Sequence, residues 1–191
     1  MRAIAPFFFL ALLAVLPSCT YYTLVPASSA VTIADAYRVE VDAPWNSRTV
    51  GNSILWTQHG QNLDSLLFFK PAGDGEPAAA APSQHGKAMP RYKKGMSFVE
   101  FPELMRTSLA NFGYSDIQIS RTEPSTLGGA RALRLDFTMR TNNSPLLKGF
   151  AVMGVKEEKL YSVMFMAEET TYYPLVAPSA EKVVARTTLQ P

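Results

Sequence analysis

The last third of the chain carries the strongest pattern in the sequence. Residues 131–140 alternate between apolar side chains and charged or hydroxyl side chains, which is the period of a strand with one buried face. Residues 146–155 and 160–167 are apolar at both sets of alternating positions, as is usual for strands that are covered on both sides. Polar residues at 142–145 and 156–159 separate the three segments. We therefore predict three consecutive antiparallel strands.

Two helices are expected to cover this sheet. Residues 102–112 have apolar side chains at helical spacing, with Pro102 suited to the first turn and Gly113 suited to the position after the last turn. Residues 172–187 show a similar spacing. Further strands are predicted at residues 37–41, 53–57, 63–70 and 117–121. Together these elements predict an α+β fold, an antiparallel β-sheet with helices packed on its faces.

The composition is that of a globular protein without a nucleic-acid partner. Hydrophobic residues make up 47% of the chain and charged residues 18%, which excludes a disordered chain. The formal net charge of +2 is too small to argue for a nucleic-acid partner. A single cysteine excludes an intrachain disulfide and a cysteine zinc site. We expect no cofactor and no metal site.

The N-terminus has the form of a secretory signal peptide. Arg2 is the only charged residue before Asp35, and residues 3–16 are apolar throughout. This run is shorter than the roughly 20 residues that a membrane-spanning helix needs. A positive start, a short apolar core and small residues after it are typical of a signal peptide, which we place at residues 1–18.

The only cysteine of the chain follows this apolar run. Leu16, Pro17, Ser18 and Cys19 resemble the lipobox of bacterial lipoproteins, in which an aliphatic residue, a tolerant position and a small residue precede the cysteine. The resemblance implies a diacylglyceryl group on the Cys19 thiol, cleavage before Cys19 and acylation, for example by palmitate, of the new amine. Thr20, in place of the Asp that retains enterobacterial lipoproteins in the inner membrane, implies the outer membrane, facing the periplasm.

The rest of the chain divides into a tether and one domain. Residues 19–34 are rich in Ser, Ala and Thr, which predicts a flexible tether between the lipid and the domain. Residues 35–191 are predicted to form a single α+β domain. Within it, residues 71–95 are rich in Pro, Gly and Ala and carry no regular pattern over most of their length, which predicts a flexible loop.

The order of the elements resembles that of the PsbP-like sandwich. The opening strand reads Tyr-x-Val-x-Val-x-x-Pro-Trp-Asn from Tyr37, and a helix after a long loop, three closing strands and a final helix follow. The chain is also similar in this order to uncharacterised bacterial lipoproteins. The resemblance covers residues 35–190, and it implies the sandwich fold but no catalytic residue.

The sequence offers few residues for catalysis. Both histidines, His59 and His85, are predicted to lie in exposed loops. His59 and Asp64, with Ser65 or Ser53, can be drawn as a triad, and they give the alternative of a periplasmic hydrolase. The Gly-x-Ser-x-Gly pattern that presents a nucleophilic serine in many hydrolases does not occur.

Other residues are candidates for binding or for the core. Arg91, Lys93 and Lys94 form the only dense basic patch, and its functional interpretation is contact with anionic lipid headgroups, with a solvated loop end as the alternative.

Trp56 is expected in the core and Trp45 at the rim of a pocket. The methionines on predicted strands are expected to fill the core.

The leading hypothesis is a non-enzymatic lipoprotein of the bacterial cell envelope. The signal peptide, Cys19 and the lack of a recognisable set of catalytic residues favour this hypothesis. The protein would be a periplasmic domain anchored in the outer membrane, and it would serve as a binding module or as an accessory module in envelope assembly. Two alternatives remain open. One is the hydrolase that uses His59 and Asp64, and the other is a carrier of an apolar ligand in a cleft between the sheet and a helix.

Overall fold

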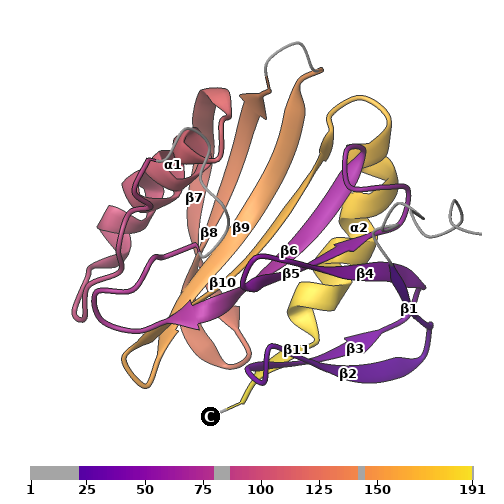
Figure 1. Ribbon diagram of the computed structural model, residues 1–191, viewed down its shortest axis with the longest axis horizontal. Helices are drawn as coiled ribbons and strands as arrows, with labels where there is room; N and C mark the ends of the chain where they lie inside the picture. Colours follow the sequence, from indigo (N-terminus) through magenta and orange to yellow (C-terminus); the bar gives the residue numbers. More distant parts are fainter. Residues whose placement is uncertain (1–21, 80–86, 142–144, 191) are drawn as a thin grey trace, which may run out of the picture.

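The described part of the chain folds into two antiparallel sheets and two α-helices (Figure 1). The computed structural model describes residues 22–79, 87–141 and 145–190. The large sheet contains, in spatial order, β1 (Thr23–Val25), β4 (Trp45–Val50), β5 (Ser53–Thr57), β6 (Asp64–Ala72), β10 (Lys159–Glu168), β9 (Leu147–Lys156), β8 (Ala130–Arg140) and β7 (Ser115–Leu127). The small sheet contains β11 (Thr187–Leu189), β3 (Tyr37–Val41) and β2 (Ser29–Ile33). The helices are α1 (Phe101–Asn111), which follows the short 3-10 helix η2 (Phe98–Glu100), and α2 (Tyr172–Ala185).

The predicted α+β fold is therefore confirmed. The three strands expected in the last third of the chain are β8, β9 and β10, which pair in sequence order. Both predicted helices form, and each lies within one or two residues of its expected ends. No helix among the described residues is long and apolar enough to cross a membrane.

The large sheet separates two apolar cores. In β10, Tyr161 and Phe165 pack on the side of α2 and the small sheet, whereas Leu160 and Met164 pack on the side of α1. We call these the α2-side core and the α1-side core. Figure 1 shows the two helices on either side of β8, β9 and β10. The central strands are apolar on both faces because both faces are covered.

A buried tyrosine joins the two sheets. The Tyr37 hydroxyl donates to the Phe69 carbonyl at 2.7 Å and accepts from the Ser162 amide at 3.1 Å. It bridges β6 and β10 where the register of these strands shifts between Leu160 and Ser162. Burial raises the pKa of Tyr37 well above its ordinary value, so the hydroxyl stays protonated and keeps its role as donor.

The tether predicted for residues 19–34 is wrong over its described part. Residues 23–25 form β1 on the edge of the large sheet, and residues 29–33 form β2 of the small sheet. Val25 and Ile33 are buried in the α2-side core, which explains why this segment is ordered despite its Ser, Ala and Thr content. The folded domain thus begins about a dozen residues earlier than residue 35.

The loop predicted for residues 71–95 is packed on the domain over much of its described part. Tyr92 is only 1% exposed, and Ala78 and Ala79 are also buried in the α1-side core. Backbone hydrogen bonds join the two arms of the loop, from Tyr92 to Glu76 and from Ala78 to Pro90. Residues 80–86 lie outside the described residues.

The expectation for one tryptophan is also wrong. Trp45 is fully buried rather than at a pocket rim, because the chain continues after Pro44 into β4 instead of ending a strand there. Its ring centroid lies 6.2 Å from that of Trp56, which is buried as predicted. The two indoles fill the α2-side core beneath β4 and β5.

Candidate functional site

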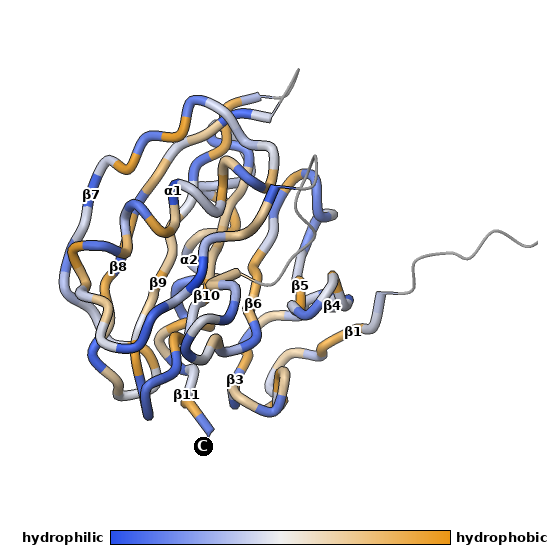
Figure 2. The backbone as a smooth tube through the Cα atoms, turned by 60° about the vertical axis from the view of Figure 1, so that its left-hand side comes forward, coloured by the Kyte–Doolittle hydropathy of each residue, from blue (hydrophilic) through white to orange (hydrophobic). Residues whose placement is uncertain are grey.

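The structure places the sequence-predicted site residues in different regions. Leu16, Pro17, Ser18 and Cys19 lie outside the described residues. The described chain starts at Tyr22, directly before β1. Figure 2 shows β1 and β7 at opposite ends of the large sheet, so the N-terminal segment joins the domain at one sheet edge.

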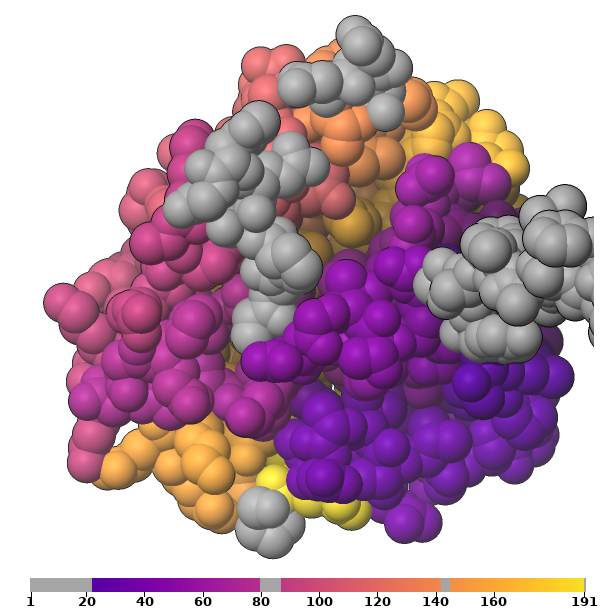
Figure 3. Space-filling view, viewed as in Figure 1, coloured from indigo at the N-terminus to yellow at the C-terminus, as the bar shows by residue number. Residues whose placement is uncertain are grey.

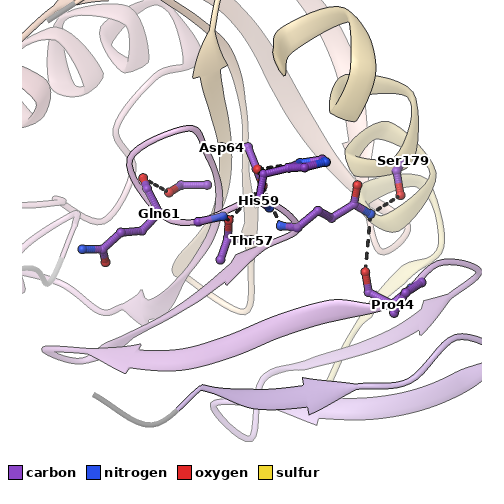
Figure 4. A network of polar contacts seen from close by, with 9 residues as sticks. Pro44, Thr57, His59, Gln61, Asp64 and Ser179 are labelled. Atoms are coloured by element: carbon purple, nitrogen blue, oxygen red, sulfur yellow. Dashed lines mark hydrogen bonds and ion pairs between the residues drawn. The ribbon is translucent and has the colours of Figure 1, made fainter. Parts of the chain in front are cut away.

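His59 and Asp64 meet at the turn between β5 and β6 (Figure 4). The Nδ1 atom of His59 lies 3.0 Å from Oδ2 of Asp64. The Asp64 side chain is fully buried, whereas the His59 side chain is 36% exposed. The His59 ring also packs against Tyr172 of α2, with 5.3 Å between the ring centroids. The predicted pair is therefore brought together.

The Asp64 carboxylate also organises the turn itself. It accepts hydrogen bonds from the Thr57 hydroxyl at 3.0 Å and from the backbone amides of Gln58 and His59 at 2.7 and 2.8 Å. The Gln58 side chain continues this network to Ser179 of α2. A buried carboxylate with this many donors has a structural role in the turn.

The serines of the predicted triad do not join this pair. Ser65 follows Asp64 in β6, so its side chain points to the opposite face of the sheet, where its hydroxyl donates to the Gln61 carbonyl at 2.9 Å. Ser53 lies at the far end of β5, about 13 Å along the strand from Thr57. Among the described residues, no group of three or more His, Cys, Asp and Glu side chains is arranged to hold a metal.

An apolar cleft opens on the α1 side of the sheet, beyond the C-terminal end of α1. Its volume is about 300 Å³. We call it the Tyr114 cleft, and it is lined by Val50, Leu55, Gln61, Ser65, Leu67, Phe112, Tyr114, Met164 and Met166. Its walls come from β4, β5, β6 and β10 and from the segment that links α1 to β7. The polar groups of its lining are the side chains of Gln61 and Ser65 and the hydroxyl of Tyr114.

A second cavity of about 300 Å³ adjoins this cleft. Gln61, Tyr114 and Met166 line both. The second cavity also contains polar side chains, among them Asn62 and Thr141. The Tyr114 hydroxyl donates to the Met166 sulfur at 3.5 Å between the two spaces, and burial raises the pKa of Tyr114. An apolar space therefore lies next to a more polar one.

Among the described residues, methionine is confined to the side of the sheet that carries the cleft. All methionines of the described residues belong to the α1-side core or pack against it: Met89, Met96, Met105, Met139, Met153, Met164 and Met166. The expectation that the strand methionines fill the core is confirmed for Met139, Met153 and Met164, which are buried. Met166 is only partly buried, and it borders the cleft. Methionine side chains adapt to irregular apolar surfaces.

The predicted basic patch has partners within the protein for two of its three residues. The Arg91 guanidinium donates to the Gly75 carbonyl at 2.5 Å. Lys94 forms an ion pair with Glu158 at 2.6 Å, which raises the pKa of the lysine. Lys93 is exposed. The patch therefore presents less free positive charge than its sequence suggests.

A cavity of about 510 Å³ lies between the β7–β8 turn and the end of α2. Arg134 lines it, hydrogen-bonded to Asp136 at 2.9 Å and Glu181 at 3.0 Å and placed 4.3 Å from the centre of the Phe150 ring. Burial works against the charged guanidinium, but these hydrogen bonds raise the pKa of Arg134. Because Asp136 and Glu181 already neutralise its charge, we assign Arg134 a structural role rather than a role in binding an anion.

Sequence reasoning did not identify the residues of the Tyr114 cleft. They come from the consecutive strands β4, β5 and β6, from the segment after α1 and from the distant strand β10, and they meet because β6 lies next to β10. The available signal was the apolar character of both faces of the predicted strands. That pattern predicts that other elements pack on each face of the sheet. It does not show where those elements end and leave a cleft.

Comparison with known proteins identifies the fold. The sequence matches no family model and no curated protein. The solution structure of cyanobacterial PsbP (CyanoP) from Synechocystis sp. PCC 6803 aligns with a TM-score of 0.54 at 12% identity, over 94% of this chain and 99% of that chain. The chain therefore has a PsbP-like fold, as its element order predicts. At this identity the likeness extends to the fold alone.

Two further structures show lower or partial similarity. A crystal structure from Bacteroides thetaiotaomicron VPI-5482 aligns with a TM-score of 0.52 at 10% identity, over 87% of this chain. The aligned region spans half the length of that protein. LpqN, described as involved in cell envelope biogenesis of Mycobacterium tuberculosis, aligns over 90% of this chain and 92% of that chain, with 13% identity and a TM-score of 0.38. A TM-score this low supports no inference.

Proposed function

We propose that this protein is an outer-membrane lipoprotein facing the periplasm, anchored by lipid on Cys19, and that its domain binds a single-chain amphiphile in the Tyr114 cleft. The observation that carries the ligand class is the lining of the cleft, which is apolar apart from Gln61, Ser65 and the Tyr114 hydroxyl. Binding sites for small ligands are commonly apolar clefts of about 300–1,000 Å³ with a few placed polar groups.

The adjoining cavities suggest how such a ligand would lie. An acyl chain would occupy the space between Leu55, Leu67 and Met164, where it buries apolar surface at about 25 cal/mol per Å². Its polar headgroup would lie past Gln61, toward the cavity that contains Asn62 and Thr141. The flexible Met166 side chain at the junction can adjust to ligands of different shape.

A non-enzymatic role is the simplest interpretation of the His59 turn. Its histidine has an orienting carboxylate, but its described contacts include no serine, threonine or cysteine. A catalytic histidine of this kind needs such a nucleophile within hydrogen-bond distance. The Asp64 carboxylate is engaged by the backbone of its own turn. We therefore propose binding rather than hydrolysis.

The ligand-binding proposal is tested with a matched pair of substitutions. Val50→Trp places a bulky ring at the wall of the cleft, and Val99→Trp places the same ring on η2, where Val99 is 83% exposed and outside the cleft. Residues 20–191 contain every described strand and helix and serve as the soluble protein. Binding of the apolar fluorophore 1-N-phenylnaphthylamine, and its displacement by laurate, is followed by fluorescence.

The proposal predicts saturable binding to the wild-type protein and to the Val99→Trp variant. The Val50→Trp variant should bind at least about tenfold more weakly, a loss of about 1.4 kcal/mol. Circular dichroism would establish that both variants are folded. Equal affinity in the two variants, or no saturable binding by the folded wild type, would contradict the proposal.

A further inference from the structure

We propose that β1 and the adjoining part of β4 form the surface through which the domain rests on the lipid bilayer. This inference builds on the proposed lipid on Cys19, and it names the face of the domain that contacts the membrane. The surface is centred on Tyr22 and Leu24, with Arg48 beside them. Its partner is the headgroup region of the bilayer that holds the anchor.

The length of chain before β1 limits the distance between domain and bilayer. Thr23 is fixed in the large sheet by its pairing with Ser47, and it lies four residues after Cys19 in the sequence. Four residues span at most about 14 Å even when fully extended. A lipid on Cys19 would therefore bring the β1 edge of the sheet to the membrane, and not the opposite edge at β7.

The side chains at this edge suit a bilayer surface. Leu24 is 62% exposed and Tyr22 is 38% exposed, and they are two of the few large apolar side chains that the described residues expose. The Arg48 guanidinium lies 5.8 Å from the centre of the Tyr22 ring. Tyrosine and arginine both favour the boundary between acyl chains and headgroups.

The register of the strands joins this surface to the Tyr114 cleft. Leu24 is paired with Asn46 of β4, and Arg48 of β4 is paired with Leu55 of β5. Directly paired residues point to the same face, as do alternate residues of one strand. Leu24, Arg48 and Leu55 therefore share the α1 side of the sheet. Leu55 lines the cleft, so the membrane surface and the cleft lie on one continuous face.

The basic patch that the sequence suggested for lipid contact lies elsewhere. Lys94 is tied to Glu158 in the β9–β10 turn, well away from β1 in the sheet order. In Figure 3 the indigo N-terminal strands and the magenta segment around residues 90–100 occupy opposite sides of the visible face. Because the connection to Cys19 is so short, the β1 edge would lie closer to the bilayer than the basic patch.

The inference is tested on the lipidated protein in vesicles of phosphatidylethanolamine and phosphatidylglycerol. Leu24→Cys, Lys93→Cys and Leu175→Cys each introduce one reactive thiol for a nitroxide label. Leu175 is a matched control, since it is 60% exposed on α2. Cys19 would not react because its sulfur carries the lipid. Electron paramagnetic resonance then compares the access of oxygen and of a water-soluble nickel complex to each label.

We expect the label at position 24 to be accessible to oxygen and shielded from nickel, and the labels at 93 and 175 to be accessible to nickel. Equal nickel access at positions 24 and 175 would overturn the proposed surface, and so would shielding at position 93 alone. Mass spectrometry of Cys19 reports separately on the lipid. A protein that lacks the lipid would refute the anchor itself, whereas a lipidated protein with an exposed position 24 would refute only the surface.

Discussion

Thr23 of β1 is paired with Ser47 of β4, only four residues after the cysteine that resembles a lipid attachment point. This pairing changes the expected relation between domain and membrane. The tether predicted from composition would let the domain move tens of Å from the bilayer. The observed strand leaves a connection of about 14 Å at most, so the proposed anchor holds one edge of the sheet close to the lipid.

The first prediction concerns the anchor. Cys19→Ser should abolish metabolic labelling with an alkyne fatty acid and release the protein from the membrane fraction, because lipid attachment needs the thiol. Thr20→Asp should keep the labelling but move the protein to the inner-membrane fraction, as the resemblance to enterobacterial lipoproteins implies. Labelling that persists in the Cys19→Ser variant would refute the anchor.

The second prediction concerns the packing of β9. A Cβ atom at Gly149 would lie 2.3 Å from the Phe165 carbonyl oxygen and 2.7 Å from the Phe137 ring. Gly149→Ala should therefore lower the free energy of unfolding by about 1–3 kcal/mol through overpacking. Gly73→Ala is the control, since its nearest neighbour would be the Glu76 carboxylate at 3.4 Å. Urea denaturation of both variants measures the difference, and equal stability would contradict the packing described.

The third prediction concerns the start of α2. The Glu168 carboxylate accepts hydrogen bonds from the backbone amides of Thr170 and Thr171 at 2.8 and 2.7 Å. These bonds lower the pKa of Glu168, so its stabilising effect is complete above the ordinary carboxyl pKa and is lost as the pH falls through the lowered value. Glu168→Gln should reduce stability at neutral pH and have less effect in acid.

The control for this variant is Glu169→Gln, which leaves both hydrogen bonds in place. Thermal unfolding at several pH values would compare the two variants with the wild type. A stability difference between Glu168→Gln and the wild type that stays constant from neutral pH to well below the ordinary carboxyl pKa would contradict the proposed role.

The fourth prediction separates a structural role of the His59 turn from a catalytic one. Asp64→Ala leaves the Thr57 hydroxyl and two backbone amides without their acceptor, and it should cost about 2–3 kcal/mol in the free energy of unfolding. His59→Ala should cost less, because the histidine side chain is partly exposed. Hydrolysis of model esters by the wild type, lost in the folded His59→Ala variant, would instead support an enzyme.

Local sequence patterns predicted the elements whose determinants are local. Residues 131–167 alternate or remain apolar in the way that three neighbouring strands require, and Pro102 and Gly113 mark the ends of α1. By contrast, β1 has only three residues, and β4 lacks a clean alternation of buried and exposed positions. These two segments form strands because they pair with each other and because β4 pairs with β5. Such pairing cannot be predicted from the composition of either segment.

The candidate site divides in the same way. His59 and Asp64 lie five residues apart around one turn, so their approach was foreseeable. The failure of Ser65 to join them follows from the two-residue period of β6, which turns neighbouring side chains to opposite faces. The Tyr114 cleft needs the adjacency of β6 and β10 and the path of the chain after α1. Both are properties of the topology.

The methionine methyl groups can report directly whether an amphiphile occupies the Tyr114 cleft. Met164 and Met166 line the cleft, whereas Met139 and Met153 lie in the same core outside it. Nuclear magnetic resonance of the protein with ¹³C-labelled methionine methyl groups would follow a titration with laurate. Binding in the cleft predicts saturable shifts of the Met164 and Met166 signals and little change at Met139 and Met153. Unchanged signals at Met164 and Met166, or equal shifts at all four, would contradict the claim.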